Sequence, residues 1–219
     1  MTEGPWELIN GPVAGEIEDL NRAVLMNVVT GLVLSLLARQ ARRPNGRPPI
    51  PNEAALRHLH QAATQFLLAK PGHYRDYDMH VEDDAGGVVF QAQPWRSIKG
   101  LMRRFFRDLA SLWATGDAVD VAAYALWRIN WIHPFSDGNG RTAIAFSYAC
   151  LCLKLGALLP GRKTMIDMIT AEPGRYVAAL NLAHQGVTGP SGEPDLSAMK
   201  AYLDELLLHQ MQTATAKAD

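Results

Sequence analysis

The chain has 219 residues, and 48% of them are hydrophobic, which is enough to fill a core without disulfide bonds. Its 21 Lys and Arg residues nearly cancel its 22 Asp and Glu residues, so a net charge of -1 gives no general attraction to nucleic acid or an anionic membrane. The two cysteines, Cys150 and Cys152, point in different directions on a helix and are not expected to pair. These features predict a cytoplasmic globular protein with neither a nucleic-acid nor a membrane partner.

The first predicted element is a long helix from about Gly15 to Arg42. Its apolar stretch, Ala23 to Ala38, resembles a membrane span but contains Asn27 and Gly31 and has 16 residues. A span needs about 20 predominantly apolar residues, so the sequence favours a buried core helix. The segment Met1 to Pro12 has no basic region followed by an apolar one, so it does not indicate a signal peptide.

The remaining elements are mostly helical. After a Pro- and Arg-rich linker, a second helix is predicted with Asn52 as its N-cap, ending near Lys70. Two short β-branched or aromatic runs around an Asp-Asp-Ala-Gly-Gly turn predict a hairpin from about Met79 to Gln93. The periodicity and stop signals then predict five helices, at Pro94–Thr115, Val119–Ile132, Asn139–Leu155, Glu172–Gln185 and Asp195–Gln212. The expected fold is therefore mostly α, with one short β-hairpin.

A loop between two of these helices carries the most informative motif, HPFSDGNGR, at residues His133 to Arg141. Pro134 disfavours a helical conformation at the preceding histidine, so the histidine is presented where the helix ends. Gly138 and Gly140 flank Asn139 at the start of the next helix, where free N–H groups and the positive end of the helix dipole favour an anion. The loop is therefore a predicted phosphate-binding cradle.

Three side chains complete the predicted chemistry of this loop. Arg141 has a planar fork suited to phosphate oxygens. Asp137 could hold Mg²⁺ on those phosphates, because Mg²⁺ prefers a few carboxylates together with phosphate oxygens and water. His133 could act as general base for an attacking hydroxyl, since its ordinary pKa is near 6.5. Taken singly, each has an ordinary structural interpretation as a helix-end histidine, a capping carboxylate or a surface charge.

Together, these nine positions resemble without mismatch the signature of the Fic family, HPFx(D/E)GNGR. The likeness extends to the Leu-His pair ending at His60, to PGHYR ending at Arg75 and to AEPGRYVAAL around Tyr176. It implies one Fic domain over residues 1–219, with a helix and linker in 1–50, the core in 51–190 and a last helix in 191–219. It also implies that the hairpin is a flap that binds an extended segment of a target protein by strand addition, through residues including Val81, Val88, Val89 and Phe90.

The resemblance implies AMP transfer from ATP, with Mg²⁺, to a Ser, Thr or Tyr hydroxyl of a target protein or of the chain itself. By the matched positions, His133 is the base, Asp137 the Mg²⁺ ligand and Phe135 a buried anchor. Residues Gly138 to Gly140 form the anion hole, and Arg141 contacts the phosphates beyond the α position. Relatives include bacterial toxins and effectors.

The sequence departs from the family at two places. Many members carry a second arginine in GRTxR, where this chain has Ile144. The family's inhibitory segment has Ser or Thr four residues before a glutamate that Gly or Asn follows, whereas Glu18 has Ala14 before it and Asp19 after it. Glu18 is therefore interpreted as an ordinary carboxylate more readily than as a regulator. Transfer of UMP, phosphocholine or phosphate, and a binding module without catalysis, stay open as alternatives.

Overall fold

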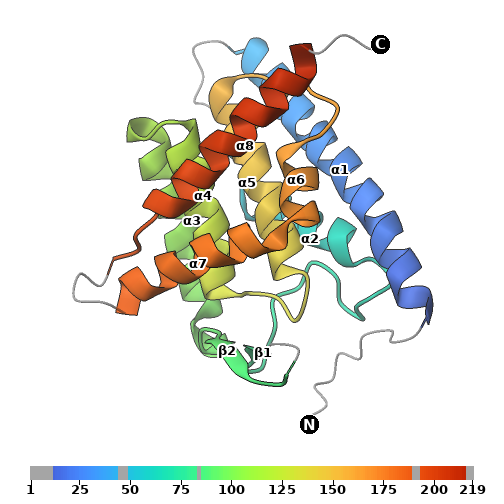
Figure 1. Ribbon diagram of the computed structural model, residues 1–219, viewed down its shortest axis with the longest axis vertical. Coiled ribbons are helices and arrows are strands. Elements are labelled where there is room, and N and C mark those ends of the chain that lie inside the picture. The colour runs from blue at the N-terminus through green and yellow to red at the C-terminus, as the bar shows by residue number, and fades with distance from the viewer. Residues whose placement is uncertain (1–11, 44–48, 83–84, 189–192, 216–219) are drawn as a thin grey trace.

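The computed structural model describes residues 12–43, 49–82, 85–188 and 193–215 (Figure 1). Within them lie eight α-helices, one 3-10 turn and one two-stranded antiparallel sheet. The elements are α1 (Pro12–Ala41), α2 (Glu53–Thr64), β1 (His80–Glu82), β2 (Val88–Gln91), η1 (Trp95–Ser97), α3 (Ile98–Thr115), α4 (Ala118–Ile132), α5 (Asn139–Leu155), α6 (Met165–Ala171), α7 (Pro173–Thr188) and α8 (Ser197–Thr215).

The predicted mostly helical fold with one hairpin is confirmed, and α5 has the bounds expected from the sequence. The short helix α6 was missed, although Thr164 and Asp167 form a capping box at its start. The second helix was predicted too long, because α2 ends at Thr64 rather than near Lys70. Phe66 adopts a left-handed backbone conformation with φ 63°, which no helix can continue through.

Helix α5 occupies the centre of the molecule, with α4, α1 and α2 packed around it (Figure 1). Nearly all its side chains from Ala143 to Leu153 are buried, because its sequence is apolar on every side. Phe146 packs against Phe105 of α3 with ring centroids 6.0 Å apart. The two helices that flank the HPFSDGNGR loop, α4 and α5, are thus the most firmly held pair, and the loop between them is fixed at both ends.

Helix α1 lies along one side of the molecule and packs against α2 and α5 (Figure 1). Leu25, Val29 and Val33 are buried in that contact. By length and composition, α1 is the one helix in the described part of the chain that could cross a membrane. Only 22% of its most apolar window is buried, so the predicted core helix buries one face and leaves the others exposed.

Candidate functional site

His133 lies at the point where α4 ends. It adopts a left-handed conformation, φ 53° and ψ 59°, while its N–H still donates to the carbonyl of Ile129. Arg75 fixes this geometry, since its Nε donates to the His133 carbonyl at 2.8 Å and its own N–H to the carbonyl of Pro134 at 2.9 Å. The unusual backbone at His133 is therefore held by contacts from outside the loop.

The imidazole of His133 is set up as a neutral base. Its Nδ1 lies 3.3 Å from the carbonyl oxygen of Asn130, and a carbonyl can only accept, so Nδ1 carries the proton in this contact. That tautomer leaves the lone pair on Nε2. Burial lowers the pKa of His133 to about 4, the Asn130 hydrogen bond opposes that shift and the nearby Arg75 charge adds to it. His133 is thus uncharged at neutral pH.

The loop between α4 and α5 is closed by its own side chains. Asn139 accepts from the N–H of Phe135 and donates to the carbonyl of Phe135, both at 2.9 Å. Phe135 is fully buried, as the predicted anchor role requires, and stacks on His60 with centroids 3.7 Å apart. Because the Asn139 amide is used up in this way, Asn139 can offer a phosphate only its backbone N–H.

His60 is the second histidine that shapes the loop. Its Nδ1 accepts from the N–H of Gly72 at 2.8 Å, and its Nε2 donates to the carbonyl of Asp137 at 2.9 Å. Burial lowers its pKa to about 4, so it stays neutral and both ring nitrogens are committed. It therefore positions the loop. Among the described residues, no three His, Cys, Asp or Glu side chains form a group able to hold a metal alone.

The two glycines of the loop have different surroundings. Gly138 has φ 71°, and a Cβ built there would lie 2.5 Å from the Thr64 methyl group, so α2 approaches too closely for any other residue. At Gly140 a Cβ would meet nothing within 4 Å. The first helical hydrogen bond of α5 runs from Thr142 to Gly138, so the preceding N–H groups have no partner within the helix. The helix start thus has open space at Gly140, which a predicted anion cradle would need, and the anion-binding role stays a prediction.

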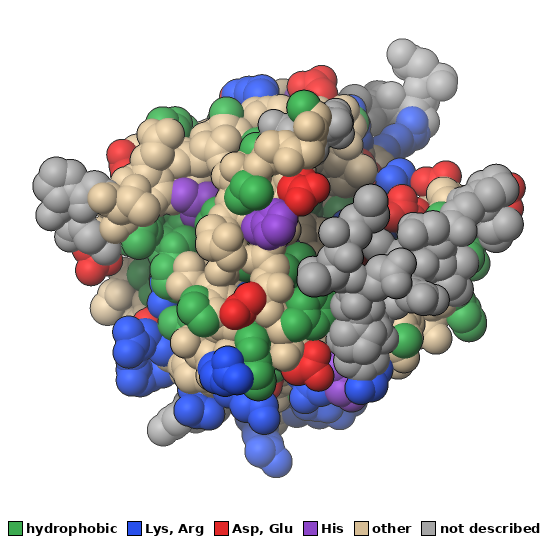
Figure 2. Space-filling model, turned by 90° about the horizontal axis from the view of Figure 1, so that it is seen from below, with side chains coloured by type: hydrophobic (Ala, Val, Ile, Leu, Met, Phe, Trp, Pro, Cys, Tyr) green, Lys and Arg blue, Asp and Glu red, His purple; other side chains and the backbone are tan. Residues whose placement is uncertain are grey.

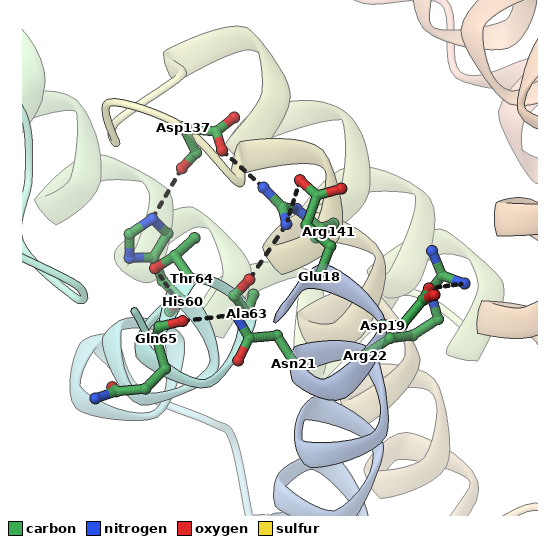
Figure 3. Close-up of polar contacts among 10 residues, drawn as sticks. All are labelled: Glu18, Asp19, Asn21, Arg22, His60, Ala63, Thr64, Gln65, Asp137 and Arg141. Atoms are coloured by element: carbon green, nitrogen blue, oxygen red, sulfur yellow. Dashed lines mark hydrogen bonds and ion pairs between the residues drawn. The ribbon is translucent and has the colours of Figure 1, made fainter. Parts of the chain in front are cut away.

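Arg141 joins the loop to two other elements (Figure 3). Its Nη2 donates to Oδ2 of Asp137 at 2.7 Å, and its Nη1 lies 3.3 Å from the Ala63 carbonyl. The same Nη1 lies 3.4 Å from Oε1 of Glu18 on α1. Half of the Glu18 side chain is exposed, so this ion pair is weak. Glu18 nevertheless has a partner in the loop, which the sequence interpretation as an ordinary helix-face carboxylate did not include.

Ile144 lines the same hollow of about 210 Å³ as Glu18 and Arg141, between α1 and α5. Its other walls include Asn21, Leu25 and Ile166. An arginine at position 144 would therefore enter a space that Glu18 already borders. The apolar Ile144 instead makes the floor of this hollow hydrophobic.

A separate cleft of about 430 Å³ lies between the hairpin, the loop and α7. Its wall contains His133 and Gly140 together with Tyr176, Val177 and Leu180 of the AEPGRYVAAL segment. It also contains three residues that the sequence did not single out, Asn130, Asn181 and His184. Three of the four predicted flap residues line it, Val81, Val89 and Phe90, whereas Val88 does not and is 59% exposed. Phe90 of the hairpin stacks on His184 of α7 with ring centroids 4.6 Å apart. This contact holds the hairpin against α7.

The sheet beside this cleft pairs His80 with Gln91, Val81 with Phe90 and Glu82 with Val88, with an irregularity after Val81.

Figure 2 views the molecule from below, at the hairpin end of Figure 1, and histidines reach the surface near the middle of this face. Most of the Lys and Arg side chains on this face gather towards one edge instead. The cation closest to the loop's acidic side chain is Arg141, which already has partners.

Residues 50–151 match the sequence model of the Fic/DOC family. This segment is a Fic domain. It contains the whole HPFSDGNGR loop, the hairpin and Arg75. Members of the Fic family transfer nucleotides or other groups to proteins. No curated protein sequence matches the chain. The predicted division into segments 1–50, 51–190 and 191–219 stays a prediction.

Solved structures of Fic proteins resemble the fold. A Fic domain containing signaling protein from Bacteroides thetaiotaomicron aligns with a TM-score of 0.67 and 19% identity, over 90% of this chain and 71% of that one. Fic-1 (residues 134–508) from C. elegans aligns with a TM-score of 0.64 and 18% identity, over 94% of this chain and 52% of that one. This chain therefore spans about half the length of that solved chain. BepC is a VirB-translocated effector protein of Bartonella tribocorum that was solved with bound AMPPNP. It aligns with a TM-score of 0.52 and 16% identity, over 88% of this chain and 87% of that one. These likenesses establish the Fic fold.

Several residues that build the Fic site carry weak signals in the sequence. Arg75 and His60 lie in short segments, PGHYR and LH, that pointed to the family without indicating any role. Their function comes from hydrogen bonds to residues about 60 to 80 positions away, at His133 and Asp137. Asn130 and His184 look like ordinary helix residues, and only the packing of α4, α7 and the hairpin brings them to the cleft.

Proposed function

We propose that the protein transfers AMP from ATP to a hydroxyl side chain of a target protein. The observation that carries the proposal is a neutral histidine with a free Nε2 in the same cleft as Gly140 and the unpaired N–H groups of α5. This combines a base with an anion-binding helix end, which is what phosphoryl transfer requires of a protein. The cleft has room for a ligand between the hairpin and α7.

In the proposed reaction, Nε2 of His133 removes the proton of the attacking hydroxyl. The hydroxyl oxygen forms a bond to the α-phosphorus of ATP, and the bond from that phosphorus to the β-phosphate oxygen breaks. Pyrophosphate leaves, and AMP stays on the target as a phosphodiester. The α5 N–H groups and Arg141 stabilise the negative charge of the phosphates, with no covalent intermediate on the protein.

Asp137 supplies a carboxylate suited to Mg²⁺ beside this anion site. Asp137 is 39% exposed, and only its Oδ2 is committed, to Arg141. Mg²⁺ is commonly bound through one or two carboxylates and the phosphates of the nucleotide, so a single carboxylate fits. Mg²⁺ would neutralise phosphate charge when bound with ATP. The AMPPNP bound to BepC supports a nucleotide as the ligand.

The test of the activity uses purified protein, Mg²⁺ and ATP labelled at either the α or the γ phosphate. We expect label from the α position to stay on protein and label from the γ position to be released. Retention of the γ label would mean a kinase and overturn AMP transfer. Intact-mass measurement with ATP, UTP and CDP-choline in parallel identifies the transferred group by its mass.

A different donor is the second candidate, because two observations weaken recognition of a terminal phosphate. Ile144 offers no charge where many Fic proteins have an arginine, and Arg141 is shared between Asp137 and Glu18. Transfer of phosphocholine from CDP-choline would need no contact beyond the second phosphate, because that donor has only two. Transfer of UMP would use UTP, which has the same three phosphates as ATP. The intact-mass experiment decides between these donors. Cytoplasmic location, and the absence of membrane and nucleic-acid partners, stay predictions.

The two loop glycines provide a matched pair of variants. Gly138→Ala should lower the free energy of unfolding by about 1 to 3 kcal/mol, because its φ is left-handed and its Cβ would strike Thr64. Gly140→Ala should leave that free energy unchanged within about 1 kcal/mol. It should still weaken ATP binding by about tenfold, since the new methyl group enters the space where phosphate would approach. Thermal unfolding and calorimetric titration with ATP measure both effects. Unchanged ATP affinity in Gly140→Ala would place the phosphates elsewhere.

The hairpin is proposed to hold the target through its backbone. Val89 lies in the cleft wall and has no cross-strand partner in the register. Val89→Pro should reduce modification of a protein target by about tenfold or more while leaving self-modification elsewhere on the chain less affected, because proline removes a backbone donor. The matched control is Val89→Ala, which keeps the N–H. Equal losses in both reactions, or in both variants, would argue against strand addition.

Glu18 is proposed to have little effect on the rate of AMP transfer. Its contact with Arg141 is 3.4 Å long and half exposed, and pairs of this kind contribute about 0 to 1 kcal/mol. Glu18→Gly should therefore change transfer by less than about tenfold. Ile144→Arg should tighten ATP binding by adding a charge beside Arg141 in the shared hollow. Strong activation by Glu18→Gly would instead identify Glu18 as a working inhibitor acting through Arg141.

A further inference from the structure

The outer face of α1 carries a regular row of exposed residues that no described part of the chain covers. Going along the helix, the spacing alternates between four and three residues, which places every member on one face. The row, called the α1 stripe below, consists of Leu20, Val24, Asn27, Gly31, Leu34 and Ala38. Leu20 is 59% exposed, Val24 38% and Leu34 50%. This is the pattern of a helix that packs against another helix.

Packing among the residues that the structure describes does not account for the stripe. The opposite face of α1, with Leu25, Val29 and Val33, is the one buried against the core. Gly31 is the clearest sign, because glycine is unfavourable inside a helix and a Cβ built there would meet nothing within 4 Å. No turn, positive φ or close neighbour requires a glycine at this position. A second helix lying close across the stripe would require one.

We propose that the α1 stripe binds the α1 stripe of a second copy of this chain, with the two helices antiparallel. The stripe is self-complementary in this orientation. Around a two-fold axis at the height of Val29, Leu20 of one copy lies opposite Ala38 of the other, Val24 opposite Leu34, and Asn27 opposite Gly31. Each large side chain therefore faces a side chain of smaller or similar size, which allows close packing. The same surface on both copies forms the contact, as an isologous interface requires.

The charges at the ends of α1 favour the same orientation. The described start of α1 carries Glu16 and Asp19, of which Asp19 also lies 3.4 Å from Arg22, and the other end carries Arg39 with Arg42 and Arg43 just beyond the helix. An antiparallel pair places the acidic end of each helix beside the basic end of the other, and it opposes the helix dipoles. A parallel pair would bring like charges together at both ends. Charge thus selects a second, antiparallel copy over a parallel one.

The proposed interface is separate from the catalytic site. Glu18 points towards Arg141 (Figure 3). It lines the hollow that also contains Ile144, on the side of α1 opposite the stripe. His133 and its cleft lie between the hairpin and α7 and share no residue with α1. Substitutions in the stripe therefore test association without touching the residues proposed for transfer.

The first experiment measures the mass of the full chain in solution by analytical ultracentrifugation over a range of concentrations. We expect a dimer of twice 24.0 kDa. Val24→Glu and Leu34→Glu, made together, should weaken the dimer at least about a hundredfold, because they bury charges in the seam. The matched control is Leu208→Glu, which changes a leucine on α8 that is 64% exposed and should leave the dimer intact. A monomer at all concentrations, or equal effects of both substitutions, would overturn the proposal.

The second experiment tests the orientation by cross-linking. A Leu20→Cys protein mixed with an Ala38→Cys protein should form a disulfide-linked heterodimer under mild oxidation. Neither alone should cross-link, since the two Leu20 positions of an antiparallel pair lie about 27 Å apart along the axis. The native Cys150 and Cys152 are buried and should not form cross-links. Cross-links within each single variant would indicate a parallel pair. Binding to phosphatidylcholine–phosphatidylglycerol vesicles that the Val24→Glu, Leu34→Glu variant loses would identify a membrane as the occupant. Either result would overturn the proposal.

Discussion

His133→Ala is expected to lower kcat/KM for transfer by about 10² to 10⁴ while ATP binding stays nearly intact. The side chain supplies a base through Nε2, and its other nitrogen is held by the Asn130 carbonyl. In the proposed mechanism, the phosphate contacts come from α5 and Arg141, which the substitution leaves in place. Calorimetric titration with ATP and initial rates with α-labelled ATP separate the two effects.

A second variant guards against a trivial loss of structure. His133 has a left-handed backbone, which asparagine tolerates better than most residues, so His133→Asn should fold with the loop unchanged and still lack the base. Both variants should unfold within a few degrees of the parent. Transfer at the parental rate by either one would remove His133 from the mechanism.

The pH dependence of kcat/KM gives an independent check on this base. Because burial lowers the pKa of His133 to about 4, kcat/KM should stay level from pH 8 to about pH 5 and fall only towards pH 4. Unfolded histidines take up protons near pH 6.5, whereas folded His133 and His60 do so near pH 4. Folding stability should therefore also fall between pH 6.5 and 4, so circular dichroism must confirm folded protein at each pH. An acid limb near pH 6.5 would contradict the buried, neutral base.

Arg75→Ala is expected to be the most destabilising substitution around the site. The Arg75 side chain is 4% exposed, and it donates to the carbonyls of His133 at 2.8 Å, Tyr77 at 2.6 Å and Gln93 at 2.5 Å. These carbonyls belong to the loop and to the two ends of the hairpin segment. Their joint loss should lower the free energy of unfolding by at least about 3 kcal/mol, since each unsatisfied buried group costs about 1 to 3 kcal/mol.

The matched control for Arg75 is an exposed arginine with good geometry. Arg175 bonds both carboxylate oxygens of Glu205 at 2.7 and 2.6 Å, but its side chain is 54% exposed. Arg175→Ala should therefore cost no more than about 1 kcal/mol. Arg75→Lys should fold only partly better than Arg75→Ala, because one ammonium group cannot reach three separated carbonyls. Denaturant unfolding of the four proteins measures these differences. Equal losses for Arg75→Ala and Arg175→Ala would show that Arg75 does not hold the loop and hairpin together.

The sequence by itself determined the features that depend on neighbours along the chain. Helix periodicity, the Asp-Asp-Ala-Gly-Gly turn and the loop motif gave the mostly helical class, the hairpin and the bounds of α5. The loop motif also predicted a chemistry for the site, since a histidine before proline and glycines at a helix start have local consequences. Gly138 is such a case, because its positive φ belongs to the turn it makes. The end of α2 could not be predicted from neighbouring residues alone. Asn21 of α1 donates to the carbonyl of Gln65, just beyond α2, at 2.8 Å.

Only the tertiary structure decided what surrounds the loop. Its hydrogen bonds from His60 and Arg75 span more than fifty residues, and no short pattern encodes such a contact. The packing also committed the Asn139 side chain to Phe135 and gave Glu18 the partner Arg141. Helix α1, predicted from its apolar sequence to be a buried core helix, has one buried face and one exposed stripe. The physical reason is common to all of these. Burial and long-range hydrogen bonds depend on which surfaces meet, and that is settled only when the helices pack.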